Sequence, residues 1–185
     1  NHTTDITAIG LAVADSPNGP FKRVENNPVL SISETFEDFD SYRIDDASIL
    51  VKDKEIWLYY KGRSRVHGAK GPAFTEMGVA IAENPEGPYV KKPKSLLDKS
   101  HEVLIWKTKK GISSLASINF SISIAADGLD FKPRYSNLKN IPKAPGLYRP
   151  SLTTNNSFDE LPNWGIAMVQ KKGLAYLVRF EIAAK

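Results

Sequence analysis

Three charged residues stand at equivalent places in the sequence, each at the start of a strand-like segment. Asp46, Glu102 and Arg149 are separated by 56 and 47 residues, too far for a local contact. If the fold brings them together, the cluster can keep one carboxyl protonated and one ionised, because like charges raise one pKa and an arginine lowers a neighbouring one. General acid/base cleavage of a glycosidic bond requires that arrangement. Salt-bridged strand ends are the alternative, and the spacing leaves both interpretations open.

The elements that must position these residues repeat along the chain. Residues 9–21 read IGLAVADSPNGPF, residues 77–89 read MGVAIAENPEGPY, and residues 121–131 form a shorter third copy, SISIAADGLDF. Each copy is a run of small and apolar residues followed by a turn and an aromatic residue. This pattern predicts a strand whose side chains alternate between two faces and which ends in a turn.

Charged turns separate further apolar runs, a pattern typical of β-hairpins. The paired runs are residues 46–51 with 55–60, 102–106 with 112–118, and 164–169 with 174–182. No segment shows a convincing period of 3.6 residues, so the sequence predicts an all-β chain. Units of four short strands that repeat at roughly 50 residues are typical of a β-propeller.

The repeat predicts a single, partial propeller domain over residues 1–185. Residues 1–30 would end one blade, and three fuller blades would start near residues 45, 101 and 148. Roughly three and a half blades fall short of the four to eight that propellers usually have, so further blades are expected outside this chain. The innermost strands of a propeller run along its central channel, so Asp46, Glu102 and Arg149 are expected to converge there.

The composition narrows the function classes. The 185 residues carry 25 Lys and Arg against 21 Asp and Glu, and the net charge of +4 is too small to indicate a nucleic-acid partner. Cysteine is absent, which excludes disulfides, thiol catalysis and cysteine metal sites. This leaves the compartment open, with the periplasm or secretion favoured over the cytoplasm. No apolar run approaches the roughly 18 residues of a membrane span, so no membrane partner is expected.

Five segments resemble a known family of enzymes. They are residues 8–21, 45–50, 57–63, 100–106 and 142–150, and the stretch Ser100-His101-Glu102-Val103 is the most specific. The segments resemble five-bladed propeller glycoside hydrolases, most of all family 117, the neoagarooligosaccharide hydrolases that act on 3,6-anhydro-L-galactose. Family 43 is a broader relative. The resemblance runs over nearly the whole chain and implies a bacterial, polysaccharide-degrading glycosidase with an oligosaccharide substrate.

The resemblance also implies roles for the acidic residues. Such enzymes use a base on the first blade, a pKa modulator on the third and an acid on the fourth. Asp46 matches the modulator, Glu102 matches the acid of the wider clan, and His101 matches a histidine implicated as the general acid in family 117. A histidine suits this role because its unperturbed pKa is about 6.5. The base should stand on a blade start before Asp46, so the chain carries the acid side of an inverting hydrolase and lacks its base.

Further residues are expected to bind sugar or to support the acids. They are Arg43, Asp45, Arg63 and Arg149, with Trp106 as a stacking platform at the channel mouth. No cofactor is expected. A divalent cation in the channel is compatible with the fold, but no ligand set is recognisable in the sequence.

Two other hypotheses stand beside the hydrolase. A non-catalytic glycan-binding or scaffold propeller would also explain a chain without a base. Alternatively, the chain is an arc of blades that forms a homo-oligomer or pairs with a second chain supplying the missing blades.

Overall fold

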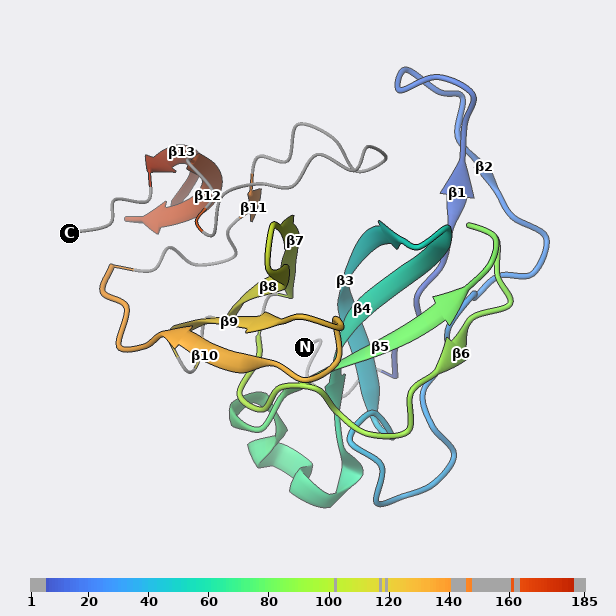
Figure 1. Cartoon of the computed structure of the whole chain (residues 1–185), viewed down its shortest axis with the longest axis horizontal. Helices are drawn as coiled ribbons and strands as arrows, with labels where there is room; N and C mark the ends of the chain where they lie inside the picture. Colours follow the sequence, from blue (N-terminus) through green and yellow to red (C-terminus); the bar gives the residue numbers. More distant parts are fainter. Residues whose placement is uncertain are drawn as a thin grey trace. The chain divides into compact units, whose positions relative to one another are not determined.

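The computed structural model describes residues 6–101, 103–116, 118, 120–140, 146–147, 161 and 164–181. Apart from one short 3-10 helix, η1 (Arg65–Ala73), the elements of this part are strands in antiparallel sheets, which confirms the all-β prediction (Figure 1). The chain divides into two compact units, Asn1–Asp98 and Lys99–Lys185. Successive sheets built from consecutive strands are consistent with a propeller-like fold.

The first unit contains a four-stranded sheet in the order β3 (Arg43–Lys52), β4 (Glu55–Arg63), β5 (Glu76–Ala82) and β6 (Val90–Lys91). The predicted hairpin is confirmed, because β3 and β4 pair in register down to Lys52 opposite Glu55. Asp53 and Lys54 form the turn with φ angles of 52° and 70°. This left-handed conformation suits a two-residue hairpin turn, since it matches the twist of the flanking strands.

The core of this sheet packs around β4, in which residues 57–60 are all buried. Tyr60 stacks on Phe39 and donates its hydroxyl hydrogen to the buried carboxylate of Asp40 at 2.8 Å. Lys91 Nζ lies 2.5 Å from the same carboxylate and ties the outer strand β6 to the core. Burial, together with the charge of Asp40, raises the pKa of Tyr60 far above its usual value, so its hydroxyl remains a hydrogen-bond donor.

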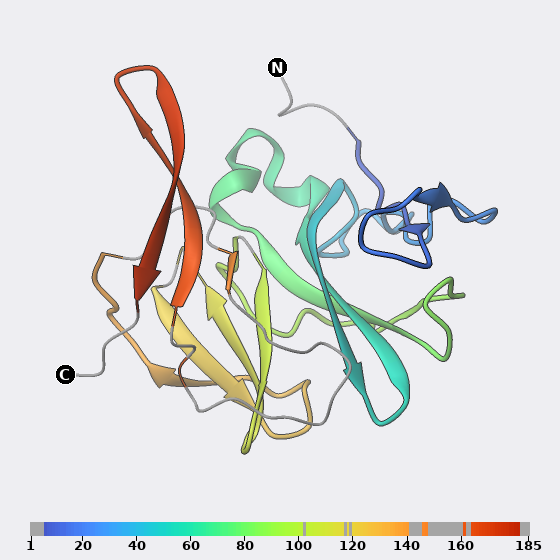
Figure 2. The same ribbon diagram turned by 90° about the horizontal axis from the view of Figure 1, so that it is seen from above.

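A second sheet of the first unit pairs β1 (Ala12–Val13) with β2 (Lys22–Arg23), drawn in blue in Figure 2. Its pairing repeats that of β5 with β6, because Ala12 faces Arg23 as Ala80 faces Lys91, 68 residues further along the chain. The sequence repeat is therefore a structural repeat of two outer strands.

The second unit contains a four-stranded sheet and three described strands of another. The first sheet has the order β7 (Leu104–Thr108), β8 (Gly111–Ala116), β9 (Ser121–Ala125) and β10 (Lys132–Tyr135). The second has β11 (Gly146–Leu147), β12 (Trp164–Lys171) and β13 (Leu174–Glu181). The blade starts predicted near residues 45, 101 and 148 lie close to β3, β7 and β11.

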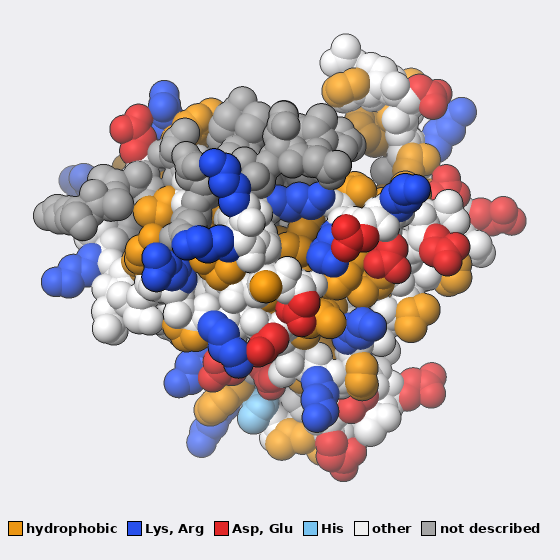
Figure 3. All heavy atoms as spheres, viewed as in Figure 1, with side chains coloured by type: hydrophobic (Ala, Val, Ile, Leu, Met, Phe, Trp, Pro, Cys, Tyr) orange, Lys and Arg blue, Asp and Glu red, His pale blue; other side chains and the backbone are white. Residues whose placement is uncertain are grey.

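The charged side chains over the strands of the first unit are mixed in sign. On the face in Figure 3, Lys and Arg side chains lie beside Asp and Glu side chains there and form no extended basic patch. In the part of the chain that the structure describes, no helix is long and apolar enough to cross a membrane.

Gly111, the first residue of β8 directly after the turn from β7, is expected to tolerate no side chain. Its φ is 135°, and a Cβ there would overlap with the carbonyl oxygen of Ala125. Gly173, in the turn between β12 and β13, has a φ of 79° but no atom near the Cβ position. We expect Gly111→Ala to lower the free energy of unfolding by more than about 2 kcal/mol and Gly173→Ala by about 1 kcal/mol. Urea unfolding measures both, and equal losses would contradict the close packing of β9 on this turn.

Candidate active site

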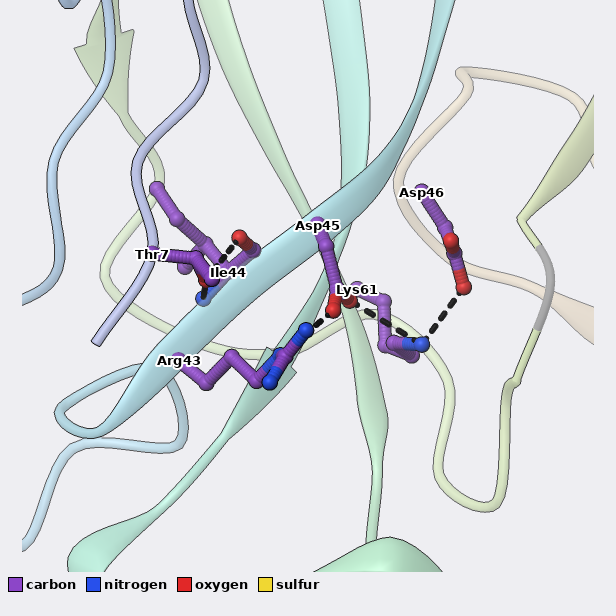
Figure 4. Close-up of polar contacts among 6 residues, drawn as sticks. All are labelled: Thr7, Arg43, Ile44, Asp45, Asp46 and Lys61. Carbon is purple, nitrogen blue, oxygen red and sulfur yellow. Dashed lines mark hydrogen bonds and ion pairs between the residues drawn. The ribbon is translucent and has the colours of Figure 1, made fainter. Parts of the chain in front are cut away.

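Four charged side chains form a cluster where β3 begins and β4 ends (Figure 4). Asp45 lies opposite Lys61 in the register of the two strands, so both side chains leave the same face of the sheet. Lys61 Nζ lies 3.0 Å from Asp45 Oδ1 and 2.5 Å from Asp46 Oδ2. Arg43 donates a hydrogen bond from Nε to Asp45 Oδ2 at 2.7 Å. The ammonium group of Lys61 thus pairs with both carboxylates, and the guanidinium of Arg43 also binds the carboxylate of Asp45.

A β-bulge explains how two consecutive residues reach one lysine. Successive side chains of a regular strand point to opposite faces. Here the register of β3 against β4 shifts between Asp45 and Ser48, and Asp46 has a φ of 50°. Aspartate adopts this left-handed conformation more readily than most residues. The bulge turns the Asp46 carboxylate towards Lys61, as Figure 4 shows, and bulges often re-aim side chains next to active sites.

The two carboxylates differ in their surroundings. The side chain of Asp45 is 25% exposed and that of Asp46 is 36% exposed. Burial acts to raise the pKa of Asp45, but the hydrogen bond from Arg43 and the charge of Lys61 outweigh it and hold this pKa below its ordinary value. Asp45 is therefore an ionised support within the cluster, and Asp46 is the more accessible carboxylate.

Thr7 holds the edge of β3 beside this cluster. Its hydroxyl donates to the carbonyl oxygen of Ile44 at 2.6 Å and accepts the N–H of Ile44 at 3.2 Å (Figure 4). Ile44 is completely buried, and buried backbone groups need such partners. Thr7 thus forms hydrogen bonds with both backbone groups of Ile44, the residue between Arg43 and Asp45. Sequence reasoning missed it, because a threonine 37 residues from its partner carries no local signal.

Arg63 lies opposite Arg43 at the end of β4 and is only 8% exposed. Its Nε has no hydrogen-bond partner, and no ion pair joins its guanidinium to another described residue. Thr75 faces Arg63 when the register of β4 and β5 is continued by one residue. Thr75 is completely buried and its Oγ1 has no hydrogen-bond partner either. Two buried polar groups without a hydrogen-bond partner among the described residues therefore lie at the same end of the sheet as Asp46.

Trp106 does not have the environment that sequence reasoning predicted. It is completely buried in the four-stranded sheet of the second unit, where it packs with Leu115 and Ile122. A ring enclosed by core side chains has no face open to a sugar, so Trp106 is a core residue and not a stacking platform.

The other predicted residues belong to the second unit. His101 lies in the loop before β7 and is half-buried. Glu102 and Arg149 fall outside the described residues. Asp46 belongs to the first unit, so its convergence with Glu102 and Arg149 on one channel stays a prediction.

The described residues contain no group of three His, Asp or Glu side chains that could hold a metal ion. The neighbouring carboxylates of Asp45 and Asp46 form ion pairs with Lys61 and Arg43 instead. A cation in the channel therefore has no ligand set among these residues.

Comparison with known proteins bears on the fold. No family model and no curated protein matches the sequence. The solved structures that match include Zg3597, a family 117 glycoside hydrolase produced by the marine bacterium Zobellia galactanivorans, with a TM-score of 0.78. The chain has the fold of part of a family 117 glycoside hydrolase. The match covers 95% of this chain at 22% sequence identity, and this chain spans about half, 51%, of that structure. The predicted resemblance is thus confirmed for the fold.

The charge cluster predicts a pH-dependent stability. Because the folded chain lowers the pKa of Asp45 from 3.8, the ionised carboxylate stabilises the fold above that pH, and the contribution is lost as the pH falls through the lower, folded value. Asp45→Asn should be less stable by about 1 kcal/mol at neutral pH and should lose less stability on acidification.

Urea unfolding between pH 7 and pH 2 measures this difference. Asp130→Asn is the control, because it removes an exposed carboxylate that pairs with exposed Lys132 at 2.8 Å. It controls for the loss of one carboxylate from the chain. Parallel curves for the wild type and Asp45→Asn would contradict the stabilising role of the Asp45 charge.

Thr7 provides a test of how the start of β3 is held. Thr7→Val removes the hydroxyl but keeps the shape, so the buried N–H and C=O of Ile44 lose two hydrogen bonds. We expect the free energy of unfolding to fall by about 1–3 kcal/mol. Thr7→Ser keeps the hydroxyl, so its free energy of unfolding should fall by less than half as much. Equal losses in thermal or urea unfolding would show that the methyl group matters more than the hydrogen bonds.

Proposed function

We propose that this chain is part of a glycoside hydrolase that releases a terminal sugar from an oligosaccharide by general acid/base hydrolysis with inversion. The observation that carries the proposal is the fold, which over 95% of the chain resembles a family 117 glycoside hydrolase. Because a fold does not imply a function by itself, the chemistry of the site must agree with it. In the first unit, the proposal gives Asp46, one of the two carboxylates that Lys61 holds at the start of β3, a supporting part in that chemistry.

In the proposed reaction, an acid gives its proton to the glycosidic oxygen as that oxygen separates from the anomeric carbon. Water attacks the carbon from the opposite face and gives a proton to a base. His101 or Glu102 is the proton donor, and the base comes from outside this chain. Solvent then returns a proton to the donor and takes one from the base. Inversion needs the acid and base about 6.5–9.5 Å apart, which leaves room for the water.

Asp46 is assigned the role of modulator. It is the more accessible of the two carboxylates on Lys61, and a negative charge raises the pKa of an acid beside it. A raised pKa keeps a donor protonated near neutral pH, where it can transfer its proton. Arg43, Asp45 and Lys61 are positioning residues in this proposal, because they hold Asp46 and the bulge that carries it.

Arg63 is the described arginine best suited to bind sugar. Arg43 already donates to Asp45, so its proposed part is support. The buried guanidinium of Arg63 has no ion pair among the described residues and has an unsatisfied Nε. Sugar hydroxyl oxygens can accept from the terminal N–H groups of a guanidinium. Arg149 is proposed for the same role on the resemblance alone.

A non-catalytic glycan-binding propeller is the second candidate. It is favoured by the observation that both carboxylates at the start of β3 are already paired with Lys61. Such a protein would bind an oligosaccharide saturably and release nothing. Sugar release and binding, measured side by side on neoagarobiose, aryl arabinosides and aryl xylosides, separate the two candidates.

The hydrolase predicts that Glu102→Gln or His101→Ala removes the proton donor of the complete enzyme. Turnover of an oligosaccharide should fall by about 10²–10⁴-fold, with the circular dichroism spectrum unchanged. The variant that lacks the donor should recover most of its rate on an aryl glycoside with a good leaving group, because that group departs without protonation. The other variant should show no such recovery, which identifies the acid.

Glu83→Gln is the control for these variants, since Glu83 is exposed in the turn after β5. It should keep the wild-type rate. Wild-type rates in both Glu102→Gln and His101→Ala would contradict the proposed acid, while saturable binding without release would favour the second candidate.

A further inference from the structure

A groove in the first unit lies at the opposite end of the β3–β6 sheet from the charge cluster. One wall comes from β1 and from residues 26–29, and the other comes from the turn between β5 and β6, residues 84–89. Lys61 faces Met77 at the start of β5, whereas this turn follows the end of β5. Figure 2 shows the turn beside the β1–β2 sheet. The groove has a volume of about 860 Å³, within the range of ligand-binding pockets, about 300–1,000 Å³.

Both walls of the groove are held by hydrogen bonds of their own. In the turn, Tyr89 donates its hydroxyl hydrogen to the carbonyl oxygen of Pro85 at 2.8 Å. On the other wall, the side chain of Asn27 accepts the N–H of Leu11 and donates to its carbonyl oxygen, both at 2.7 Å. These bonds fasten residues 26–29 beside β1. Walls that are already ordered lose less conformational entropy when a ligand binds.

The side chains that line the groove combine apolar surface with planar polar groups. Val13 is 37% exposed and Pro28 lies beside it in the lining. Tyr89 is half-buried and packs against the core of the sheet, which holds its ring in place. Asn26 and Asn84 are exposed, and each side-chain amide offers two donor hydrogens and an acceptor oxygen. A fixed aromatic ring beside such amides suits a ligand that has an apolar face and several hydroxyl groups.

The charge of the groove favours a neutral ligand. Among the described residues that line it, Glu86 is the one charged residue, and none is a lysine or an arginine. A phosphate, sulfate or carboxylate group would therefore meet a negative charge without a compensating cation. The hydroxyl groups of a neutral sugar can instead donate to Glu86 and bond with the two amides.

We propose that this groove binds a neutral oligosaccharide. The apolar face of one sugar ring packs on Tyr89, and its hydroxyl groups bond with Asn26, Asn84 and Glu86. The choice of a sugar among neutral ligands with several hydroxyl groups rests on the proposed function. A long substrate held here, at the opposite end of the sheet from Asp46, would have a raised effective concentration at the enzyme.

A proline-rich peptide is the alternative occupant of such a groove. Peptides of this kind bind grooves that are lined by aromatic rings. Here Tyr89 is the one aromatic residue among the described residues of the lining. The amides and the carboxylate beside it match hydroxyl groups better than they match proline rings, so the sugar is favoured.

Titration of the intact 185-residue chain with neoagarohexaose, a neutral hexasaccharide, tests the proposal by NMR. The side-chain amide signals of Asn26 and Asn84 should shift saturably. A sulfated galactan hexasaccharide should bind the groove at least about tenfold more weakly, because the lining offers no cation to its sulfate groups.

Three variants locate the binding site. Tyr89→Ala removes the ring and should weaken binding about tenfold. Asn84→Ala removes one exposed amide, leaves the core of the sheet intact and should weaken binding about 3–10-fold. Phe21→Ala is the matched control, because Phe21 stands 68 positions before Tyr89 in the repeat, is 63% exposed and does not line the groove. It should leave the affinity unchanged.

The proposal would be overturned by the absence of a saturable shift at Asn26 and Asn84, or by an unchanged affinity in both Tyr89→Ala and Asn84→Ala. Shifts caused by a proline-rich peptide but not by the oligosaccharide would also overturn it and would identify a polypeptide as the occupant. These outcomes leave the hydrolase untouched, since the complete enzyme tests it through His101 and Glu102. Conversely, binding in the groove without any release of sugar would support this proposal and contradict the hydrolase.

Discussion

The buried ammonium group of Lys61 is the interaction on which the start of β3 depends. Its side chain is 7% exposed, and a charge in that position needs counter-charges. Asp45 and Asp46 supply them from consecutive positions, which a regular strand would place on opposite faces. The bulge and the ion pairs therefore require each other, because the left-handed backbone of Asp46 brings its carboxylate to Lys61, and Lys61 in turn stabilises that backbone.

Local patterns in the sequence were sufficient for the strands but not for the site. The hairpin of β3 and β4 follows from apolar runs and a charged turn, and both act over a few residues. The contact of Asp46 with Lys61 depends on a bulge and on a register that joins residues 15 apart, which no motif encodes. The same is true of Thr7. Trp106 was assigned wrongly. A tryptophan before a charged turn gives the same sequence pattern in a core as at a channel mouth, and only tertiary packing distinguishes the two environments.

Comparison of the two repeats shows which features depend on local sequence and which depend on neighbouring strands. Residues 9–24 and 77–92 share their small-residue strand, their turn and their backbone hydrogen bonds on the side of the outer strand. They differ in burial, since β5 has β4 beside it and β1 has no described strand in that place. Similar sequences can therefore form the same local structure in both copies, while a buried core forms only where the neighbouring strand is present.

Where β3 begins and β4 ends, some positive side chains have negative partners and one does not. This difference links the stability of the sheet to the proposed binding of sugar. Arg43 and Lys61 are neutralised by Asp45 and Asp46, whereas Arg63 has no ion pair among the described residues. An unsatisfied buried polar group costs about 1–3 kcal/mol, and a charged one costs more. A side chain that served packing alone would be more stable as an apolar residue of similar size. In the proposed hydrolase, the charge of Arg63, which no described residue pairs with, would be balanced by the oxygen atoms of a bound sugar.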